Sequence, residues 1–271
     1  MSTSIYYFSG TGNSLSIARQ LGNQINDKVN IIDLACYTYQ NQIEITSDAI
    51  GFVFPVYFQT IPDIVKNFVR KIKFKTKPYI FAVATSNAGP GHCLFTLSKH
   101  INKVGLSLSS GFVIDMPGNS LIVRDYTNPI EVQKQRLFHS KKKLIEISAH
   151  INKRSIIKLE GNNKFKYYLQ GFITGTFAKH IYKTPSKFIA TDKCIHCSIC
   201  VSICPVKNIK LSSDKIPNWG RNCTQCLACF HWCPQKAIEI GSSTINKQRY
   251  TNPDISKDDL IKNRTLNTLA N

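Results

Sequence analysis

The stretch from Cys194 to Pro234 reads CIHCSICVSICPVKNIKLSSDKIPNWGRNCTQCLACFHWCP and decides how this chain is interpreted. It contains two copies of one pattern, Cys-x2-Cys-x2-Cys-x3-Cys-Pro, with identical internal spacing. A loop with this spacing can supply three thiolates to an iron–sulfur cubane, and the fourth cysteine of the run ligates the neighbouring cluster. The stretch therefore predicts two interlocked [4Fe–4S] clusters.

The eight cysteines divide into two sets of four. The first cluster is assigned Cys194, Cys197, Cys200 and Cys233, and the second is assigned Cys223, Cys226, Cys229 and Cys204. Each Cys-Pro pair is followed by a short apolar turn that ends in Ile209 or Ile238. We expect these two isoleucines to cover the clusters from water.

Zinc and disulfides are the alternatives for these cysteines. Paired Cys-x2-Cys motifs also bind zinc, but zinc needs four ligands and would leave the third cysteine of each run without a role. Disulfides need an oxidising compartment, and Met1 to Ser4 shows neither the basic nor the apolar part of a signal peptide. The segment resembles the bacterial two-cluster ferredoxins.

A glycine- and hydroxyl-rich loop follows the first apolar run of the chain. Residues 5–8 are apolar, Ser9-Gly10-Thr11-Gly12-Asn13-Ser14 comes next, and apolar residues at helical spacing begin at Leu15. A strand, such a loop and a helix form an anion site, because loop amides and the helix N-terminus point positive dipoles at the anion. Neither GxxxxGK[ST] nor GxGxxG is present, so neither a nucleoside triphosphate loop nor a dinucleotide fingerprint is indicated.

This loop resembles the FMN phosphate loop of flavodoxins, [ST]-x-T-G-x-[ST]. The match covers Ser9, Thr11, Gly12 and Ser14, and Asn13 occupies the free position. The resemblance implies that hydroxyl and amide donors hold the phosphate of FMN. A plain glycine turn is the alternative.

Apolar runs alternate with helical patterns through the first half of the chain. Strands are expected at 5–8, 29–34, 49–54, 79–85 and 112–114, and helices from about 15, after 60, at 92–104 and at 129–151. Thr60 is expected to be the N-cap of the second helix. The alternation predicts an α/β fold with a flavodoxin-like, doubly wound, parallel five-stranded sheet, followed by a small α+β two-cluster ferredoxin domain.

Ligands of such sheets bind beyond the carboxyl ends of the strands, and two segments there supply further candidate FMN contacts. They are Pro55, Val56, Tyr57 and Phe58 after the third strand and Ser86, Asn87, Ala88 and Gly89 after the fourth. Tyr57 is expected to stack on the isoalloxazine ring. Phe58 is the alternative residue for this stacking, and the alternative role for either is that of a core or exposed aromatic residue. Residues 86–91 can bring backbone amides to the ring edge. Residues 116–120 should also lie nearby, with no role assigned.

The chain has 271 residues, enough for two domains. We expect a flavodoxin-like FMN-binding domain at 1–151, a helical connector at 152–186, a two-[4Fe–4S] ferredoxin domain at 187–243 and a polar, partly ordered tail at 244–271 with a short helix capped by Ser256. An apolar connector helix is expected to dock between the domains, and a helix on a membrane surface is the alternative. Its apolar residues are Phe165, Tyr168, Leu169, Phe172, Phe177 and Ile181.

Charge and hydropathy restrict the location and the partners. No apolar run approaches the ~20 residues that span a bilayer, so no transmembrane segment is expected and a cytoplasmic location is predicted. The net charge is +19, and residues 134–187 hold 13 Lys or Arg against two acids. A solvated basic face explains this run, and no nucleic-acid-binding motif accompanies it.

Cys93 lies near the start of a predicted helix. Its thiol could have a redox role or could be a buried structural group, and we favour the structural role.

Over nearly its whole length the chain resembles the flavodoxin–ferredoxin fusion proteins of anaerobes, the ferrodoxins. The resemblance rests on residues 6–14 and 55–58, both cysteine runs, and residues 232–234, 237–238 and 249–250. It implies FMN and two clusters in one polypeptide that couples one-electron and two-electron steps in anaerobic metabolism. It also implies a redox partner protein of unknown identity, for which an acidic surface is one option.

The alternative function is an FMN-dependent reductase of a small molecule, fed by its own clusters. The sequence shows no catalytic constellation, so no catalytic residue is named. Whether the protein is an electron carrier or an oxidoreductase enzyme stays open at this point.

Overall fold

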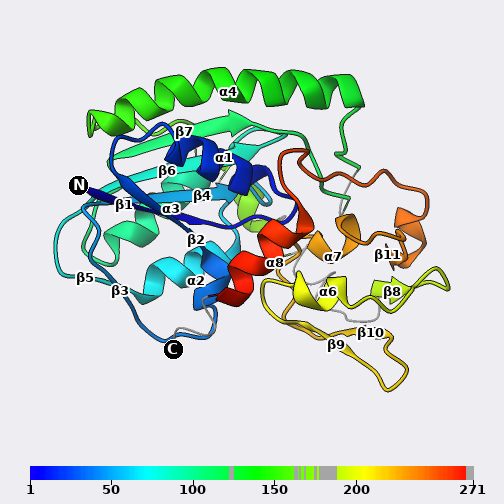
Figure 1. The fold of residues 1–271 in the computed structure, drawn as a ribbon. Coiled ribbons are helices and arrows are strands. Elements are labelled where there is room, and N and C mark those ends of the chain that lie inside the picture. Colours follow the sequence, from blue (N-terminus) through cyan, green and yellow to red (C-terminus); the bar gives the residue numbers. More distant parts are fainter. Residues whose placement is uncertain are drawn as a thin grey trace.

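The computed structural model describes residues 1–121, 125–161, 164, 166–167, 169–173, 176 and 188–266. Its N-terminal part is built on one sheet of five parallel strands in the order β2-β1-β4-β6-β7 (Figure 1). Their bounds are Lys28–Asp33 for β2, Ser2–Tyr7 for β1, Ala49–Pro55 for β4, Tyr79–Ser86 for β6 and Ser110–Asp115 for β7. The doubly wound parallel sheet predicted from the sequence is confirmed.

Helices cover both faces of this sheet. On one face α1 (Asn13–Gly22) packs against α4 (Ile130–Asn152), and on the other α2 (Asp63–Lys71) packs against α3 (Cys93–Asn102) (Figure 1). The central strands β1, β4 and β6 are almost wholly buried because they are covered on both sides. Outside the sheet, η1 (Leu34–Tyr37) follows β2, and β3 (Ile43–Ile45) pairs with β5 (Ile72–Phe74).

The prediction that Thr60 caps the second helix was wrong. Helix α2 begins at Asp63, and its N-cap position is Pro62. A residue that precedes proline is restricted to extended backbone, so Ile61 cannot carry the helix back to Thr60. Thr60 instead closes a tight turn with Tyr57, in which the two residues exchange N–H···O bonds of 3.0 and 2.9 Å.

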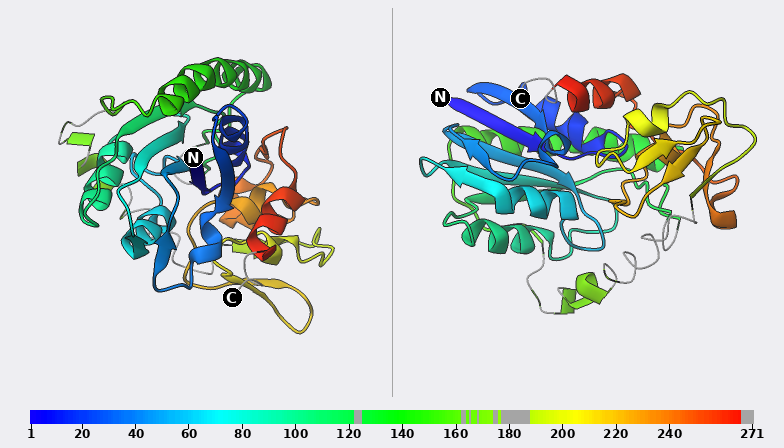
Figure 2. Two further views of the ribbon diagram at one scale, coloured as in Figure 1. Left: turned by 60° about the vertical axis from the view of Figure 1, so that its left-hand side comes forward. Right: turned by 90° about the horizontal axis from the view of Figure 1, so that it is seen from below.

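The cysteine-rich part folds as a separate small unit beside the carboxyl ends of the large sheet (Figures 1 and 2). It contains two antiparallel pairs, β8 (Phe188–Ala190) with β11 (Ile238–Ile240) and β9 (Ile209–Leu211) with β10 (Pro217–Trp219). Two four-residue helices, α6 (Ile199–Ser202) and α7 (Ala228–His231), each follow the second cysteine of a run, and η3 (Gly241–Thr244) follows β11. The two halves repeat one structural motif, as the duplicated spacing predicts.

The C-terminal segment returns to the first domain. Helix α8 (Lys257–Leu266) lies against the N-terminal strands next to the cluster unit (Figure 2). Ser256 caps α8 as predicted, because its hydroxyl accepts from Asp259 N–H at 3.1 Å while Asp259 accepts from Ser256 N–H at 2.8 Å. This segment is packed against the rest of the molecule, since Tyr250, Asn252 and Leu260 are buried, and how far the tail is ordered as a whole stays a prediction.

The connector differs from its prediction where it is described. Leu169 and Phe172 are largely exposed, so they do not form the buried face of a docked helix. Phe165, Tyr168, Phe177 and Ile181 lie outside the described residues. Within the described ranges, no helix combines the length and the apolar character that crossing a membrane requires.

Candidate functional site

The predicted phosphate loop lies between the end of β1 and the start of α1. Gly12 has a φ of +99°, a left-handed conformation that glycine adopts without strain, and its N–H donates to Ser9 Oγ at 3.0 Å. The hydroxyl of Ser14 is 2.9 Å from that of Thr85, and Asn119 Nδ2 donates to Thr11 Oγ1 at 2.6 Å. Both hydroxyls are thus oriented by neighbouring strand ends before any ligand binds.

Asn13 has a supporting role that its free position in the motif did not suggest. Its Nδ2 donates to Pro117 O at 3.0 Å. Its Oδ1 accepts from Tyr250 Oη at 2.6 Å and from Asn252 Nδ2 at 3.0 Å. The Asn13 side chain therefore ties the phosphate loop to the segment after β7 and to the C-terminal segment.

A cavity of about 260 Å³ opens at the carboxyl ends of the strands. Its walls contain every residue named as an FMN contact except Gly12: Ser9, Thr11, Asn13, Ser14, Pro55, Val56, Tyr57, Phe58, Ser86, Asn87, Ala88 and Gly89. Residues 116–120, which had no assigned role, also line it. This flavin cavity therefore unites the segments that the sequence placed after β1, β4, β6 and β7.

The turn that carries Tyr57 and Phe58 is strained. Phe58 and Gln59 have φ angles of 50° and 61°, which are uncommon for residues other than glycine. The loop after β6 holds this turn in place, because His92 N–H donates to Gln59 O at 2.8 Å. Strained backbone that its surroundings enforce is characteristic of functional sites, and here it brings Tyr57 and Phe58 to the wall of the flavin cavity.

The cluster unit closes the flavin cavity on one side. Gln225, Cys226 and Leu227 line it together with the phosphate loop. Tyr57 lines this cavity with Cys226, and burial first, then the charges of Cys226 and Cys223, raise the pKa of Tyr57. Sequence reasoning missed this wall, because no local pattern shows how two domains dock.

The eight cysteines form the two sets predicted from their spacing. Cys194, Cys197, Cys200 and Cys233 line one apolar cavity, and Cys204, Cys223, Cys226 and Cys229 line another. Burial first, and then the charges of Cys197, Cys233 and Cys194, raise the pKa of Cys200 to about 11. Burial, and then Cys204 and Cys223, raise that of Cys226 to about 12. We call the set that includes Cys226 the proximal set and the other the distal set.

Both cysteine loops use the same strained backbone. Left-handed residues occur at matching positions of the two runs: His196, Ser198 and Lys207 in the first, and Gln225, Leu227 and Lys236 in the second. This winding points N–H groups at the thiols, with Asn208 N 3.2 Å from Cys204 Sγ and Ala237 N 3.3 Å from Cys233 Sγ. Such donors stabilise thiolates and the clusters that thiolates bind.

These residues fit iron–sulfur clusters by the chemistry of their donors. Each set offers four thiols around an apolar cavity, and the buried Ile209 lines the proximal cavity while the buried Ile238 lines the distal one. Two buried polar atoms beside the proximal set, Trp219 Nε1 and Thr224 Oγ1, have no hydrogen-bond partner among the described protein atoms. In the part of the chain that the structure describes, no three His, Cys, Asp or Glu side chains are arranged to hold a single metal ion.

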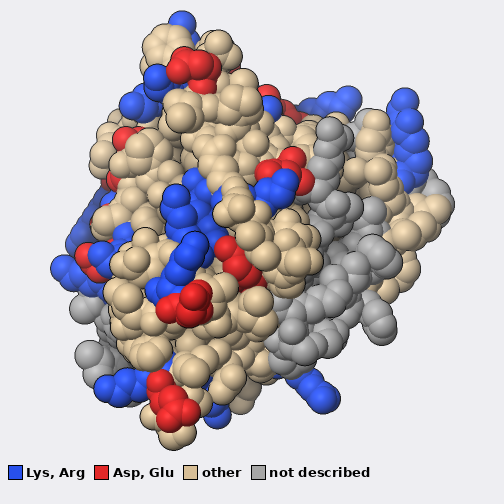
Figure 3. Space-filling model, turned by 90° about the vertical axis from the view of Figure 1, so that its right-hand side faces the viewer, with Lys and Arg blue, Asp and Glu red and all other residues tan. Residues whose placement is uncertain are grey.

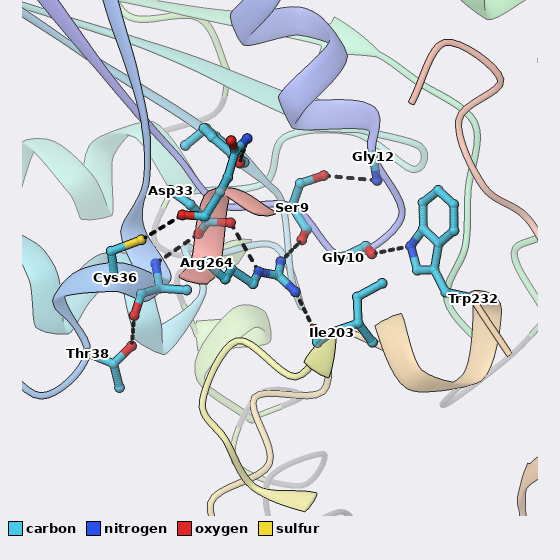
Figure 4. Close-up of polar contacts among 12 residues, drawn as sticks. Ser9, Gly10, Gly12, Asp33, Cys36, Thr38, Ile203, Trp232 and Arg264 are labelled. Atoms are coloured by element: carbon cyan, nitrogen blue, oxygen red, sulfur yellow. Dashed lines mark hydrogen bonds and ion pairs between the residues drawn. The ribbon is translucent and has the colours of Figure 1, made fainter. Parts of the chain in front are cut away.

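Direct contacts join the proximal loop to the phosphate loop. Trp232 Nε1 donates to Gly10 O at 2.9 Å, and a Cβ at Gly10 would lie well under 3.0 Å from the carbonyl oxygen of Cys226 (Figure 4). His231 Nε2 is 2.8 Å from Asn119 O, and His231 Nδ1 accepts from Tyr250 N at 3.1 Å, so the imidazole is neutral with its proton on Nε2. Burial lowers the pKa of His231 to about 4.

The distal set faces outward. Cys197 is exposed, and so are Ile195 and Lys215, which line the same cavity. Figure 3 shows that the side of the molecule with the cluster unit carries basic and acidic side chains scattered over a mostly uncharged surface. The charge of this side therefore does not by itself select an acidic partner, which stays a prediction.

Cys93 is fully buried, and burial raises the pKa of its thiol to about 12. It lies in α3 and packs within the main core rather than lining the flavin cavity. A thiol held protonated in the core is unreactive, which agrees with the structural interpretation.

The fold and these sites define a protein with a flavodoxin-type nucleotide cavity beside a pair of cysteine-lined cluster sites. Comparison with protein families supports both halves: residues 4–92 match the flavodoxin domain family and residues 193–238 match the 4Fe-4S dicluster domain family. The chain thus joins a flavodoxin domain to a 4Fe-4S dicluster ferredoxin domain, the arrangement of flavodoxin–ferredoxin fusion proteins. FMN and iron–sulfur clusters are the cofactors of these two domains, which have a role in electron transfer or redox chemistry.

Several solved structures are similar to about half of the chain. Flavodoxin 1 from Bacillus cereus is 14% identical, with 56% of this chain and 98% of that chain covered and a TM-score of 0.37. The azoreductase from Bacillus anthracis is 11% identical, with 56% and 100% covered and a TM-score of 0.36. Reduced flavodoxin from Megasphaera elsdenii is 15% identical, with 54% and 98% covered and a TM-score of 0.34. No curated protein sequence matches the chain.

Proposed function

We propose that this protein moves electrons between two [4Fe–4S] clusters and a bound FMN within one chain. The distal and proximal cysteine sets would each ligate one cluster, and the flavin cavity would bind FMN with its phosphate at residues 9–14. The observation that carries the proposal is the shared wall, in which Cys226, a predicted cluster ligand, lines the same cavity as the phosphate loop.

The order of the sites suggests the route. The distal set is at the surface, where a partner protein can approach, and the proximal set lies between it and the flavin cavity. The clusters exchange single electrons and FMN accepts one or two, so together they convert between the two kinds of step. The chain supplies the arrangement: the Gly10 and Trp232 contacts fix the proximal loop against the phosphate loop, and Tyr57 borders both sites.

Stopped-flow mixing of the anaerobic holoprotein with dithionite tests the proposal. The clusters should be reduced first and should then pass electrons to FMN at a rate that does not depend on protein concentration. Iron and acid-labile sulfide should be close to eight per chain, as two cubanes require. A transfer rate proportional to protein concentration, or zinc in place of iron, would contradict the proposal.

One observation favours a second candidate, the FMN-dependent reductase. A further cavity of about 270 Å³ lies across the Tyr57–Thr60 turn from the flavin cavity, and Lys66, His92, His100 and Cys223 line it. Gln59 Oε1, His100 Nδ1 and Thr224 Oγ1, all in its wall, are buried without a hydrogen-bond partner among the described atoms. A small molecule with both hydrogen-bond donors and acceptors could satisfy them. Steady oxidation of the reduced protein by a small molecule, without any protein partner, would favour this function.

A further inference from the structure

Arg264, in the last part of α8, joins three segments that are far apart in the sequence. Its Nη2 donates to Ser9 O at 2.7 Å, its Nε donates to Asp33 Oδ2 at 3.1 Å, and its Nη1 donates to Ile203 O (Figure 4). Arg264 and Asp33 are both buried. A buried guanidinium with all three nitrogens engaged is fixed in place, because moving it would leave a charge and several carbonyls unsatisfied.

Each contact of Arg264 bears on a cofactor site. Ser9 is the first residue of the phosphate loop, and Ile203 immediately precedes Cys204, a member of the proximal set. Asp33 ends β2 and also accepts from Ala35 N–H at 2.8 Å, so it anchors the arginine to the large sheet. Arg264 therefore connects the phosphate loop and the peptide of a cluster ligand to one rigid point.

The charge of Arg264 lies close to the proximal set, because its Nη1 donates to the carbonyl of Ile203, the residue before Cys204. Burial has the largest effect on the pKa of Arg264 and lowers it, but the negative charges of Asp33 and then of Cys226 together raise it. Asp33 and Ile203 lie on opposite sides of the guanidinium, so the cation is nearer to the cluster loop than the carboxylate is (Figure 4). A cluster bound by thiolates becomes more negative when it is reduced, and a fixed cation at short range stabilises that form.

We propose that Arg264 is a positioning residue that raises the reduction potential of the proximal cluster and holds its Cys204 loop against the phosphate loop. The inference rests on the proposed function. It assigns to the C-terminal helix, which belongs to neither cofactor domain, control over the cluster that adjoins the flavin. The distal cluster lies outside the reach of this side chain, whose hydrogen bonds go to Ser9, Asp33 and Ile203.

The test compares three variants of the full-length holoprotein by redox titration followed with electron paramagnetic resonance. Arg264→Met removes the charge with similar length, Arg264→Lys keeps the charge without the planar fork, and Arg19→Gln is the matched control. Arg19, in α1, also binds α8 to the first domain through an ion pair with Asp259 at 2.7 Å. Asp259 is near the start of α8, whereas Arg264 is near its end.

We expect Arg264→Met to make reduction of the proximal cluster at least tenfold less favourable, which is about 59 mV for a one-electron couple. The distal cluster should be unchanged in the same sample. Arg264→Lys should recover most of the shift, and Arg19→Gln should shift neither cluster. An unchanged proximal potential in Arg264→Met, or an equal shift in Arg19→Gln, would overturn the inference.

Loss of Arg264 leaves Asp33 as a buried, unpaired carboxylate, and Arg264→Met could therefore fail to fold. The double variant Asp33→Asn with Arg264→Met avoids this problem, and it should show a smaller shift in the same direction. No shift in the folded double variant would also count against the inference. Intramolecular transfer in the unmodified protein is measured separately, so failure of the proposed function is distinguishable from failure of this assignment.

Discussion

Replacing Gly10 with Ala tests the contact that joins the two cofactor domains. The new Cβ would lie well under 3.0 Å from the carbonyl oxygen of Cys226, whereas ordinary contact begins at 3.4 Å. The obstacle is a backbone atom of a loop that two left-handed residues, Gln225 and Leu227, already constrain. The two loops must therefore separate by about an ångström, because neither can rotate a side chain out of the way.

Overpacking of this kind costs about 1–3 kcal/mol. In a chain of this size each kcal/mol lowers the melting temperature by about 2–4 °C. We therefore expect a lower melting temperature together with slower electron transfer from the clusters to FMN, because the cluster loop moves away from the cavity wall. Calorimetry and stopped-flow absorbance on the anaerobic holoprotein measure the two effects.

Gly22→Ala is the matched control for this substitution. It makes the same change at the end of α1, where the nearest atom to the new Cβ is the flexible end of Ile31 at 3.1 Å. It should leave the transfer rate unchanged. If Gly10→Ala kept both the melting temperature and the transfer rate of the unmodified protein, the reasoning that this contact holds the two domains together would be refuted.

Three further predictions concern the thiols, the phosphate loop and the C-terminal helix. Cys204→Ala should lose the proximal cluster, keep the distal one and hold about four iron per chain; resonance spectra that show loss of the distal cluster would contradict the ligand sets. Thr11→Val should weaken FMN binding by about 1–3 kcal/mol, because hydrogen bonds to charged groups are in this range, and fluorescence titration measures it. The partner Arg19 lowers the pKa of Asp259 to about 2, so the carboxylate stabilises the fold above its ordinary pKa of 3.8 and loses this effect as the pH falls toward 2. The unmodified protein should therefore lose more unfolding free energy between pH 5 and pH 3 than the Asp259→Asn variant does. The difference should be less than about 1 kcal/mol, because the ion pair is partly exposed. Equal losses in the two proteins would argue against this role of Asp259.

The sheet and the grouping of the thiols could be predicted from the sequence because each depends on a repeating pattern. Strands buried on both faces are continuous apolar runs, such as 49–54, and a short run of this kind is typical of a central strand in a parallel sheet. The cysteine sets follow from spacing alone, because a short loop can place three thiols on one side and the fourth must reach the neighbouring site. The domain boundaries, the residues that bind FMN and the cysteines assigned to each cluster stay predictions.

The C-terminal segment could not be predicted for a physical reason. Its buried residues Tyr250, Asn252 and Arg264 are polar, so their composition resembles that of a solvated tail. Among their partners are Asn13, Thr11 O, Ser9 O and Ile203 O, which lie more than 60 residues away in the sequence. Polar side chains are buried when they satisfy hydrogen bonds, and no periodicity along a chain indicates where such partners will be found.

The position of this segment bears on why the two domains occur in one chain. A flexible tether would raise the encounter rate of two modules without fixing their geometry. Here the chain continues past the cluster unit and returns, so that Asn252 N–H donates to Thr11 O at 2.8 Å and Ile255 packs beside Gly12. Trp232 and Cys226 contact the same loop from the cluster unit. The loop is thus held between two segments that both follow the first domain in sequence, and this arrangement fixes the distance between cluster and cavity more firmly than a linker could.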